Sequence, residues 1–220
     1  MTSRSLSAGA LAGTARRLYR DAPFGTRVLQ GLRPYICPFD ALLRWIPANA
    51  HMLDVGCGAG LFLGFVGEMR PDVSGIGFDA NAGVIAAART MARSNFAGDR
   101  IRFQHLTVQE AWPEGAFDVV SIIDVLHHIP PAAQRAVIEQ AFAHVRPGGV
   151  LIYKDMADGS PLHAWWNRLH DLLMARQWIH YLPLEHVERW LEAAGANMLA
   201  IDRQKRGPYD HEWIVAARPA

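Results

Sequence analysis

Hydrophobic positions between residues 50 and 155 follow two alternating patterns. Short apolar runs predict strands, and the segments between them carry apolar residues at helical spacing. The expected strands are His51–Val55, Val73–Phe78, Ile101–His105, Phe117–Ile123 and Val150–Tyr153. The expected helices are Leu61–Met69, Ala82–Asn95 and Ala132–Val145. Phe117–Ile123 shows no polar alternation, which is typical of a strand covered on both faces, so the pattern predicts an α/β fold with a doubly wound, mostly parallel sheet.

The two ends of the chain follow other patterns. Residues 1–15 are rich in Ser, Ala and Gly, and we expect them to be poorly ordered. Residues 16–46 predict two or three short helices, which Pro34 and Pro38 interrupt. We therefore expect an N-terminal helical extension or lid over residues 1–46 and one α/β domain over residues 47–220.

The last third predicts two more helices and two closing strands. The expected helices are Ser160–Leu173, with an apolar stripe, and Leu184–Ala194, stopped by Gly195. Met198–Asp202 and Glu212–Ala217 predict an antiparallel pair at the end of the sheet.

Composition narrows the class of protein. Half of the 220 residues are hydrophobic and the net charge is +1, so the chain can bury one sizeable core and lacks the basic surplus of a nucleic-acid binder. Two cysteines form no disulfide framework, which favours the cytoplasm. No apolar run is long enough to span a membrane, and Leu6–Ala15 lacks a signal-peptide core. Ten histidines show no metal-ligand spacing, so we expect no metal site.

A glycine-rich loop follows the first expected strand and opens a helix. Residues 53–60 read Leu-Asp-Val-Gly-Cys-Gly-Ala-Gly, and glycines at alternate positions let a ligand approach the backbone closely. A dinucleotide fingerprint would need glycine where Leu61 stands, and a phosphate-binding Walker loop would need Gly-Lys-Ser/Thr. The acid at Asp54 suits a cationic ligand better than a pyrophosphate.

This segment resembles motif I of the class I S-adenosylmethionine-dependent methyltransferases of the small-molecule type. Gly75–Asp79, Phe117–Pro130 and Arg146–Leu151 resemble three further motifs of that family, in the same order. The resemblance implies a Rossmann-like methyltransferase fold with a mostly parallel seven-stranded sheet and an antiparallel strand near the C-terminus. It also implies S-adenosyl-L-methionine as the cofactor.

The resemblance assigns cofactor contacts to particular residues. Asp54 and the loop backbone would hold the amino-acid end of the cofactor, and Asp79 would hold both ribose hydroxyls. Asp124 would face the ligand's ammonium group or the acceptor. The expected cofactor residues are Asp54, Gly56, Cys57, Gly58, Gly60, Asp79, Ala80, Thr107, Val108 and Asp124.

Three of these assignments have alternatives. Thr107 stands where the family commonly places an acid for the adenine amino group, and a hydroxyl accepts that hydrogen bond more weakly. Asp79 could instead be the N-cap of the following helix. For Cys57 we expect a small buried filler rather than a nucleophile.

Candidate catalytic residues follow the fourth and fifth expected strands. His127 or His128 could act as the general base, because histidine titrates near neutrality; both could equally serve the packing of the loop. Asp155 lies past the end of strand five and is the third candidate.

Aromatic residues predict the acceptor side. We expect Tyr19, Trp178, His180 and Tyr181 to line the acceptor, while Trp165 and Trp166 suit a helix core. The place after strand four lacks the Asn/Asp-Pro-Pro-Tyr/Phe signature of amine methylation, so we expect O- or C-methylation of a small aromatic or apolar molecule in secondary metabolism.

Residues 153–156, 167–171 and 177–181 resemble methyltransferases of bacterial aryl-polyene pigment pathways. That resemblance implies an aromatic acceptor that is either free or presented on an acyl carrier protein. A basic rim would suit a carrier, and the candidates for it are Arg168, Arg176, Arg203, Lys205 and Arg206.

Two alternatives belong to other classes. One is a nicotinamide-dependent oxidoreductase, which Asp54 and Leu61 disfavour. The other is a non-catalytic methyltransferase-fold module that binds a ligand or lies on a membrane through Leu162–Leu173. The oligomeric state is not predicted by any of these patterns.

Overall fold

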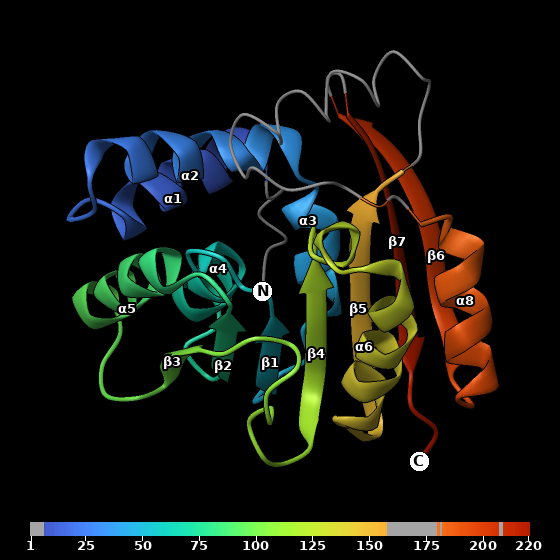
Figure 1. Cartoon of the computed structure of the whole chain (residues 1–220). Coiled ribbons are helices and arrows are strands. Elements are labelled where there is room, and N and C mark those ends of the chain that lie inside the picture. The colour runs from blue at the N-terminus through green and yellow to red at the C-terminus, as the bar shows by residue number, and fades with distance from the viewer. Residues whose placement is uncertain (1–6, 158–179, 181, 207–208) are drawn as a thin grey trace. The chain divides into compact units, whose positions relative to one another are not determined.

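The computed structural model describes residues 7–157, 180, 182–206 and 209–220 (Figure 1). The chain divides into two compact units, residues 1–113 and 114–220. The expected boundary between residues 46 and 47 stays a prediction.

The first unit contains a parallel three-stranded part of the sheet in the order β3-β2-β1. Its strands are β1 (His51–Val55), β2 (Ser74–Asp79) and β3 (Ile101–His105), and its connecting helices are α4 (Leu61–Met69) and α5 (Ala82–Asn95). These elements match the expected ranges, with β2 displaced by one residue. Parallel pairing places the last residues of these strands along one edge, where Val55 leads into the glycine-rich loop.

Helices precede this part of the sheet. They are α1 (Ala8–Leu18), α2 (Phe24–Ile36), α3 (Phe39–Leu42) and the 3₁₀ turn η1 (Leu43–Trp45). The expectation that residues 1–15 are poorly ordered is wrong for residues 8–15. Ser7 caps α1 by accepting a hydrogen bond from Ala10 N, and Leu11, Ala12 and Ala15 are buried. Alanine is the best helix former, and its small side chain lets α1 pack closely on its neighbours α2 and α4.

Pro34 does not interrupt α2, contrary to expectation. The helix continues to Ile36, and Pro34 removes only the one backbone hydrogen bond that its own N–H would have donated. Pro38 does separate α2 from α3, as expected.

The second unit contains a mixed four-stranded part of the sheet in the order β4-β5-β7-β6. Its elements are β4 (Phe117–Ile123), the 3₁₀ turn η2 (Leu126–His128), α6 (Pro131–Ala143), β5 (Val145–Met156), α8 (Leu184–Ala193), β6 (Asn197–Arg206) and β7 (Tyr209–Ala217). β5 is parallel to β4, whereas β7 is antiparallel to both β5 and β6. The seven strands of the two units confirm the predicted mostly parallel, doubly wound class with its antiparallel C-terminal strand.

β5 is longer than expected. Val145 pairs with Phe117 and Val150 pairs with Val119, so the residues between Val145 and Val150 form a bulge inside the strand. Gly148, at φ 76°, supplies the left-handed conformation that this bulge requires. Pro147, Gly148 and Gly149 were expected to precede the strand, but they lie inside it, within the bulge.

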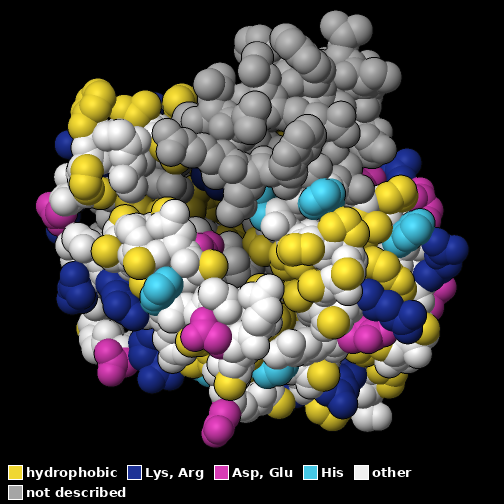
Figure 2. Space-filling model, viewed as in Figure 1, with side chains coloured by type: hydrophobic (Ala, Val, Ile, Leu, Met, Phe, Trp, Pro, Cys, Tyr) yellow, Lys and Arg dark blue, Asp and Glu magenta, His cyan; other side chains and the backbone are white. Residues whose placement is uncertain are grey.

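The outward face of α2 is apolar. Phe24, Val28, Leu29, Leu32, Tyr35 and Ile36 are all exposed, and their spacing places them on one side of the helix. Its buried residues are Gln30, Gly31 and Pro34. Figure 2 shows hydrophobic side chains on the surface where Figure 1 places this helix. The usual arrangement, with the apolar face buried, is thus reversed.

No helix in the described part of the chain is long and apolar enough to cross a membrane.

Candidate active site

The glycine-rich loop adopts a backbone conformation that residues with a side chain rarely adopt. Gly56, Gly58 and Gly60 have φ of 64°, 54° and 82°, in the left-handed region that favours glycine. A Cβ on Gly60 would meet the ring of Phe103 at 2.4 Å, so the loop also packs tightly on β3. A Cβ on Gly58 would meet no atom of the described residues within 4 Å. The loop is therefore closed on its inner side and open above Gly58.

Asp79 is oriented by the backbone at the end of β2. Gly58 N donates to its Oδ2 at 2.9 Å, and Asn81 N donates to its Oδ1 at 2.8 Å. Each carboxylate oxygen has two lone-pair positions, so both can accept a further hydrogen bond. The N-cap of α5 is Asn81, whose side chain accepts from Gly83 N and Val84 N. The alternative that Asp79 is the N-cap is wrong.

Asp54 and Tyr19 lie beneath the loop. The Asp54 side chain is 2% exposed, and the Tyr19 hydroxyl donates to the carbonyl of Ala59 at 2.6 Å. Burial raises the pKa of the Tyr19 phenol and of the Cys57 thiol, and the charge of Asp54 raises both further. Both groups are therefore neutral at pH 7. Tyr19 was expected at the acceptor; that role stays a prediction, and its observed contact is with the loop.

Thr107 and Val108 follow β3, and two residues that the sequence did not single out hold them. Thr107 N donates to Glu110 Oε2 at 2.7 Å, and Trp112 Nε1 donates to the carbonyl of Val108 at 3.1 Å. Hydrogen bonds from the backbone and the side chain of Thr107 lower the pKa of Glu110. An acid is thus present beside Thr107, three residues further along than the family pattern would place it.

These residues of the first unit fit S-adenosylmethionine. The open space above Gly58 gives a ligand access to the backbone, and the oriented Asp79 carboxylate can accept from a ribose diol. The carboxylates of Asp54 and Asp79 suit a positively charged ligand, whereas they would repel a phosphate. Ala80 follows Asp79 and is exposed.

The three expected catalytic residues lie together in the second unit. His127 Nδ1 is 2.5 Å from Asp155 Oδ1, and both side chains are almost fully buried. An ionised carboxylate only accepts, so Nδ1 carries the hydrogen and Nε2 is the basic nitrogen of the ring. Asp155 also accepts from the backbone N of His127 at 3.3 Å and of Met156 at 2.8 Å. His128 is exposed, and its ring centroid lies 4.1 Å from that of His127.

Asp124 begins the turn after β4. It adopts φ 58°, which only a few residue types tolerate, and its carboxylate pairs with Lys154 Nζ. The Lys154 side chain is fully buried in β5. The charge of Asp124 is therefore compensated within the second unit, a partner that the sequence analysis missed. A lysine inside an otherwise apolar strand was the available signal, because a buried charge requires a partner.

His180 is the second predicted acceptor residue, after Tyr19, that lies among the described residues. His180 is exposed, and its backbone N donates to the carbonyl of His127 at 2.9 Å. The buried Gln134 amide donates to the carbonyls of Leu126, Ile129 and His180. Trp178 and Tyr181 lie outside the described residues, as do Trp165, Trp166, Arg168, Arg176 and the expected helix Ser160–Leu173.

The histidines and acids of the described part of the chain form no group of three or more that could hold a metal ion.

Comparison with known proteins identifies the family. The chain matches the methyltransferase domain family over residues 31–201, and it therefore belongs to that family. The predicted resemblance to class I S-adenosylmethionine-dependent methyltransferases is confirmed, and with it the expected cofactor of the family.

Particular relatives agree with this class. A ubiquinone biosynthesis O-methyltransferase from Psychrobacter cryohalolentis is 35% identical over 107 residues, which are 48% of this chain and 40% of that protein. An O-methyltransferase family protein from Burkholderia thailandensis has a TM-score of 0.69 at 23% identity and covers 93% of this chain and 62% of its own. Magnesium protoporphyrin IX methyltransferase from Synechocystis PCC 6803, solved with bound SAH, has a TM-score of 0.68 at 19% identity, with 94% and 93% covered. The aligned part of this chain spans less than half of the first relative's length.

Proposed function

We propose that the chain is an S-adenosylmethionine-dependent methyltransferase that methylates a hydroxyl oxygen or a ring carbon of a small aromatic or apolar acceptor. The observation that carries the proposal is the buried contact between His127 and Asp155, which gives the fold a positioned general base. Bases of this kind contribute roughly 10²–10⁴-fold to a rate.

The cofactor supplies a methyl group already activated by a positive sulfonium, so the protein's main chemical task is to prepare the nucleophile. Deprotonating a phenol of pKa about 10 at pH 7 costs about 4 kcal/mol. His127 Nε2 takes this proton. Asp155 keeps the ring in the correct tautomer through Nδ1 and stabilises the imidazolium that forms.

The first unit binds the cofactor in this proposal. Asp54 and the backbone from Gly56 to Gly60, with Cys57, hold its amino-acid end. Asp79 accepts from the ribose hydroxyls. Thr107, kept in place by Glu110, accepts from the adenine amino group. Asp124, a residue of the second unit, accepts from the ligand's ammonium group or from the acceptor through the lone pairs that Lys154 leaves available.

The acceptor class is supported by the chemistry of the base and by the name of one relative. A histidine base suits a phenol or an activated ring carbon, and the name of the Psychrobacter relative specifies O-methylation. The finer expectations stay part of the proposal: secondary metabolism, a cytoplasmic location, and an acceptor that is free or on an acyl carrier. Arg203 is one of the residues expected to form a basic rim for an acyl carrier protein. It pairs with Glu185 and Glu212, so less of its positive charge is available to such a carrier than expected.

Methyl transfer from labelled S-adenosylmethionine to phenols, catechols and carrier-bound aromatic acids tests the proposal. We expect transfer to at least one hydroxylated aromatic, and Asp155→Asn should lower kcat at least tenfold while S-adenosylhomocysteine affinity stays within twofold. Glu139→Gln, which removes a carboxylate from an exposed pair on α6, is the matched control. Full kcat in Asp155→Asn would remove the base from the proposal. Tight NAD binding without S-adenosylmethionine binding would favour the oxidoreductase instead.

The apolar face of α2 favours a second candidate function, peripheral binding to an anionic membrane. Its exposed side chains form one continuous face. Residues 8–36 carry five arginines and one aspartate, so electrostatic attraction to anionic lipids would add to apolar insertion. This site differs from the Leu162–Leu173 stripe considered from the sequence, which lies outside the described residues.

Co-sedimentation with vesicles separates this candidate from catalysis. We expect binding to phosphatidylglycerol vesicles, weaker binding to phosphatidylcholine vesicles, and loss of both in the double variant Phe24→Ser/Leu32→Ser. Leu199→Ser, at an exposed leucine on β6, is the control. Equal sedimentation of the two variants would exclude α2 as the membrane contact.

A further inference from the structure

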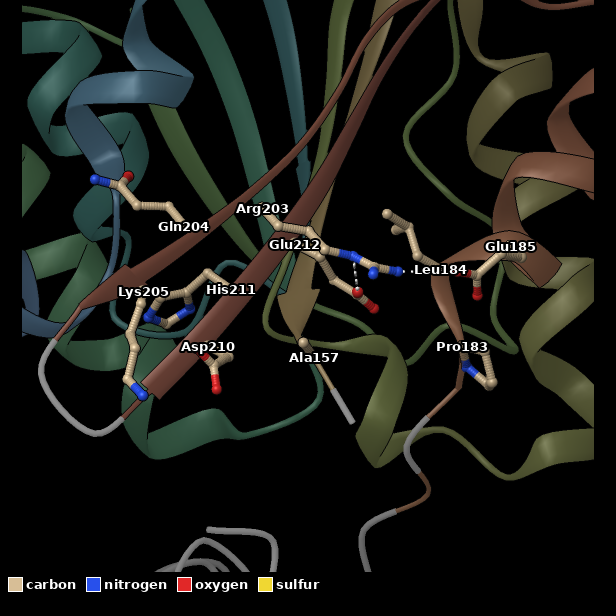
Figure 3. Close-up of a pocket in the computed structure, with 10 residues that line it drawn as sticks. All are labelled: Ala157, Pro183, Leu184, Glu185, Arg203, Gln204, Lys205, Asp210, His211 and Glu212. Atoms are coloured by element: carbon tan, nitrogen blue, oxygen red, sulfur yellow. Dashed lines mark hydrogen bonds and ion pairs between the residues drawn. The ribbon is translucent and has the colours of Figure 1, made fainter. Parts of the chain in front are cut away.

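A cavity of about 470 Å³ lies within the unit of residues 114–220, beside the hairpin of β6 and β7 (Figure 3). Ala157 at the end of β5 and Pro183 and Leu184 at the start of α8 form its apolar wall. The volume is in the range of small-molecule sites. Its polar side is built mainly from charged residues, and none of the proposed methyl-transfer chemistry uses it.

Glu212 is the buried polar group of this cavity. Its side chain is 3% exposed, and Oε2 forms an ion pair with Arg203 Nε at 3.3 Å. Oε1 is buried and has no hydrogen-bond partner among the described residues. Figure 3 shows the carboxylate beside the Arg203 guanidinium, facing the start of α8. A buried acceptor without a donor is costly, so this oxygen suits a ligand that brings the donor.

The acids that line the cavity are Glu185, Asp210 and Glu212, and its bases are Arg203 and Lys205. Arg203 also donates to Glu185 at 2.9 Å, and Lys205 faces Asp210 as its cross-strand partner. Arg203 is therefore shared between Glu185 and Glu212, and it contacts Glu212 through Oε2. The cavity therefore carries one surplus negative charge when Glu212 is ionised.

We propose that this cavity binds a small organic cation, whose ammonium group donates to Glu212 Oε1 while its apolar body packs on Ala157, Pro183 and Leu184. A charge-assisted hydrogen bond would satisfy the buried oxygen and offset the surplus charge in one contact. The site does not depend on the proposed methyl transfer, because all of its residues lie outside the cofactor and base assignments.

Protonation of Glu212 makes this binding pH-dependent. Burial raises its pKa to about 7, the charges of Glu185 and Asp155 raise it, and Arg203 lowers it. The titratable and charged groups that face it are Arg203 and Lys205 on β6, Tyr153 and Asp155 on β5, Glu185 on α8, and Asp210 and His211 on β7. A cation binds the ionised form, so its affinity should rise as the pH rises through 7.

Calorimetric titration with cyclohexylamine, cyclohexanol and cyclohexanecarboxylate tests the proposal on the whole chain without cofactor. The three probes share one body and differ in charge, and an alkylammonium stays protonated up to about pH 10. At pH 8 we expect cyclohexylamine to bind at least tenfold more tightly than the carboxylate, with the alcohol between them. Its affinity should fall about tenfold at pH 6, since the ionised fraction of a group with pKa near 7 falls by that factor.

Glu212→Gln should weaken cyclohexylamine binding at least tenfold and remove its pH dependence. Glu192→Gln, an exposed glutamate on α8 that does not line the cavity, should change neither. Thermal melting checks that each variant folds; if Glu212→Gln does not, the wild-type pH series decides. Equal affinity at pH 6 and pH 8, or tighter binding of the carboxylate, overturns the proposal. S-adenosylhomocysteine binding, measured separately, shows that such a failure leaves the methyltransferase proposal standing.

Discussion

The regions of the two units that we propose to face ligands are built differently. In the first unit the site is formed mainly by backbone: three glycines shape the loop, and backbone N–H groups orient Asp79. In the second unit, buried side chains pair with one another, as His127 does with Asp155 and Lys154 with Asp124. A site formed by backbone suits the cofactor, which is the same molecule in every such enzyme. A site formed by side-chain pairs can change by substitution, which would let it bind a different acceptor.

This contrast predicts different responses to mutation. Removing a side chain at the site formed by backbone should weaken one ligand contact and leave the loop intact. Removing one member of a buried pair should leave the other without its partner, with a larger penalty.

The largest effect should come from His127→Ala. Loss of a general base predicts a fall in kcat of roughly 10²–10⁴-fold, or about 3–5 kcal/mol, with S-adenosylhomocysteine affinity nearly unchanged. Single-turnover methyl transfer measures the chemical step directly. His128→Ala removes the neighbouring exposed ring and serves as the comparison. If His128→Ala alone loses turnover, the roles of the two histidines are exchanged.

Lys154→Met should lower the free energy of unfolding by about 3–5 kcal/mol, because it leaves the largely buried Asp124 without its cation. Urea denaturation measures the loss. The double variant Lys154→Met/Asp124→Asn should recover much of it, since both charges are then absent. Arg135→Met breaks an exposed pair with Glu139 and should cost under about 0.5 kcal/mol. Equal losses in the two single variants would contradict the contrast.

Asp79→Ala should weaken cofactor binding by about 1.5–3 kcal/mol, the range for a lost hydrogen bond to a charged group. Calorimetry with S-adenosylhomocysteine gives the value, and Asp202→Ala, at an exposed site on β6, is the control. An unchanged affinity would show that Asp79 does not hold the ribose.

The smallest effect should come from Tyr19→Phe, which deletes the hydroxyl that donates to Ala59. We expect a loss of about 1 kcal/mol in stability and a modest rise in the Kd for S-adenosylhomocysteine, since the loop loses one anchor. Tyr35→Phe, on the exposed face of α2, should be neutral. A strong loss of kcat with unchanged Kd would instead support Tyr19 as an acceptor residue.

Sequence predicted the site formed by backbone well. The strand, the loop and α4 could be located because glycine positions and apolar runs are local signals, and β1, α4, α5, β3 and β4 agree with their expected bounds. The three catalytic candidates were also named, yet their contact was not foreseen. His127 and Asp155 are 28 residues apart, and only the pairing of β4 with β5 brings them together.

Other features depended on tertiary context. The order of residues 8–15 follows from burial of Leu11 and Ala15, which composition does not reveal. Glu212 looked like the start of an ordinary strand, because its burial depends on cross-strand neighbours Asp155 and Arg203. Local pattern cannot report such long-range neighbours.

The left-handed backbone of Asp124 restricts which sequences can share this site. Glycine and asparagine adopt that conformation readily, but they would leave the buried ammonium of Lys154 without its carboxylate. Glutamate would keep the charge, but its side chain disfavours the left-handed conformation. A saturation library at this position should therefore retain aspartate almost alone, with other residues returning only when position 154 becomes uncharged.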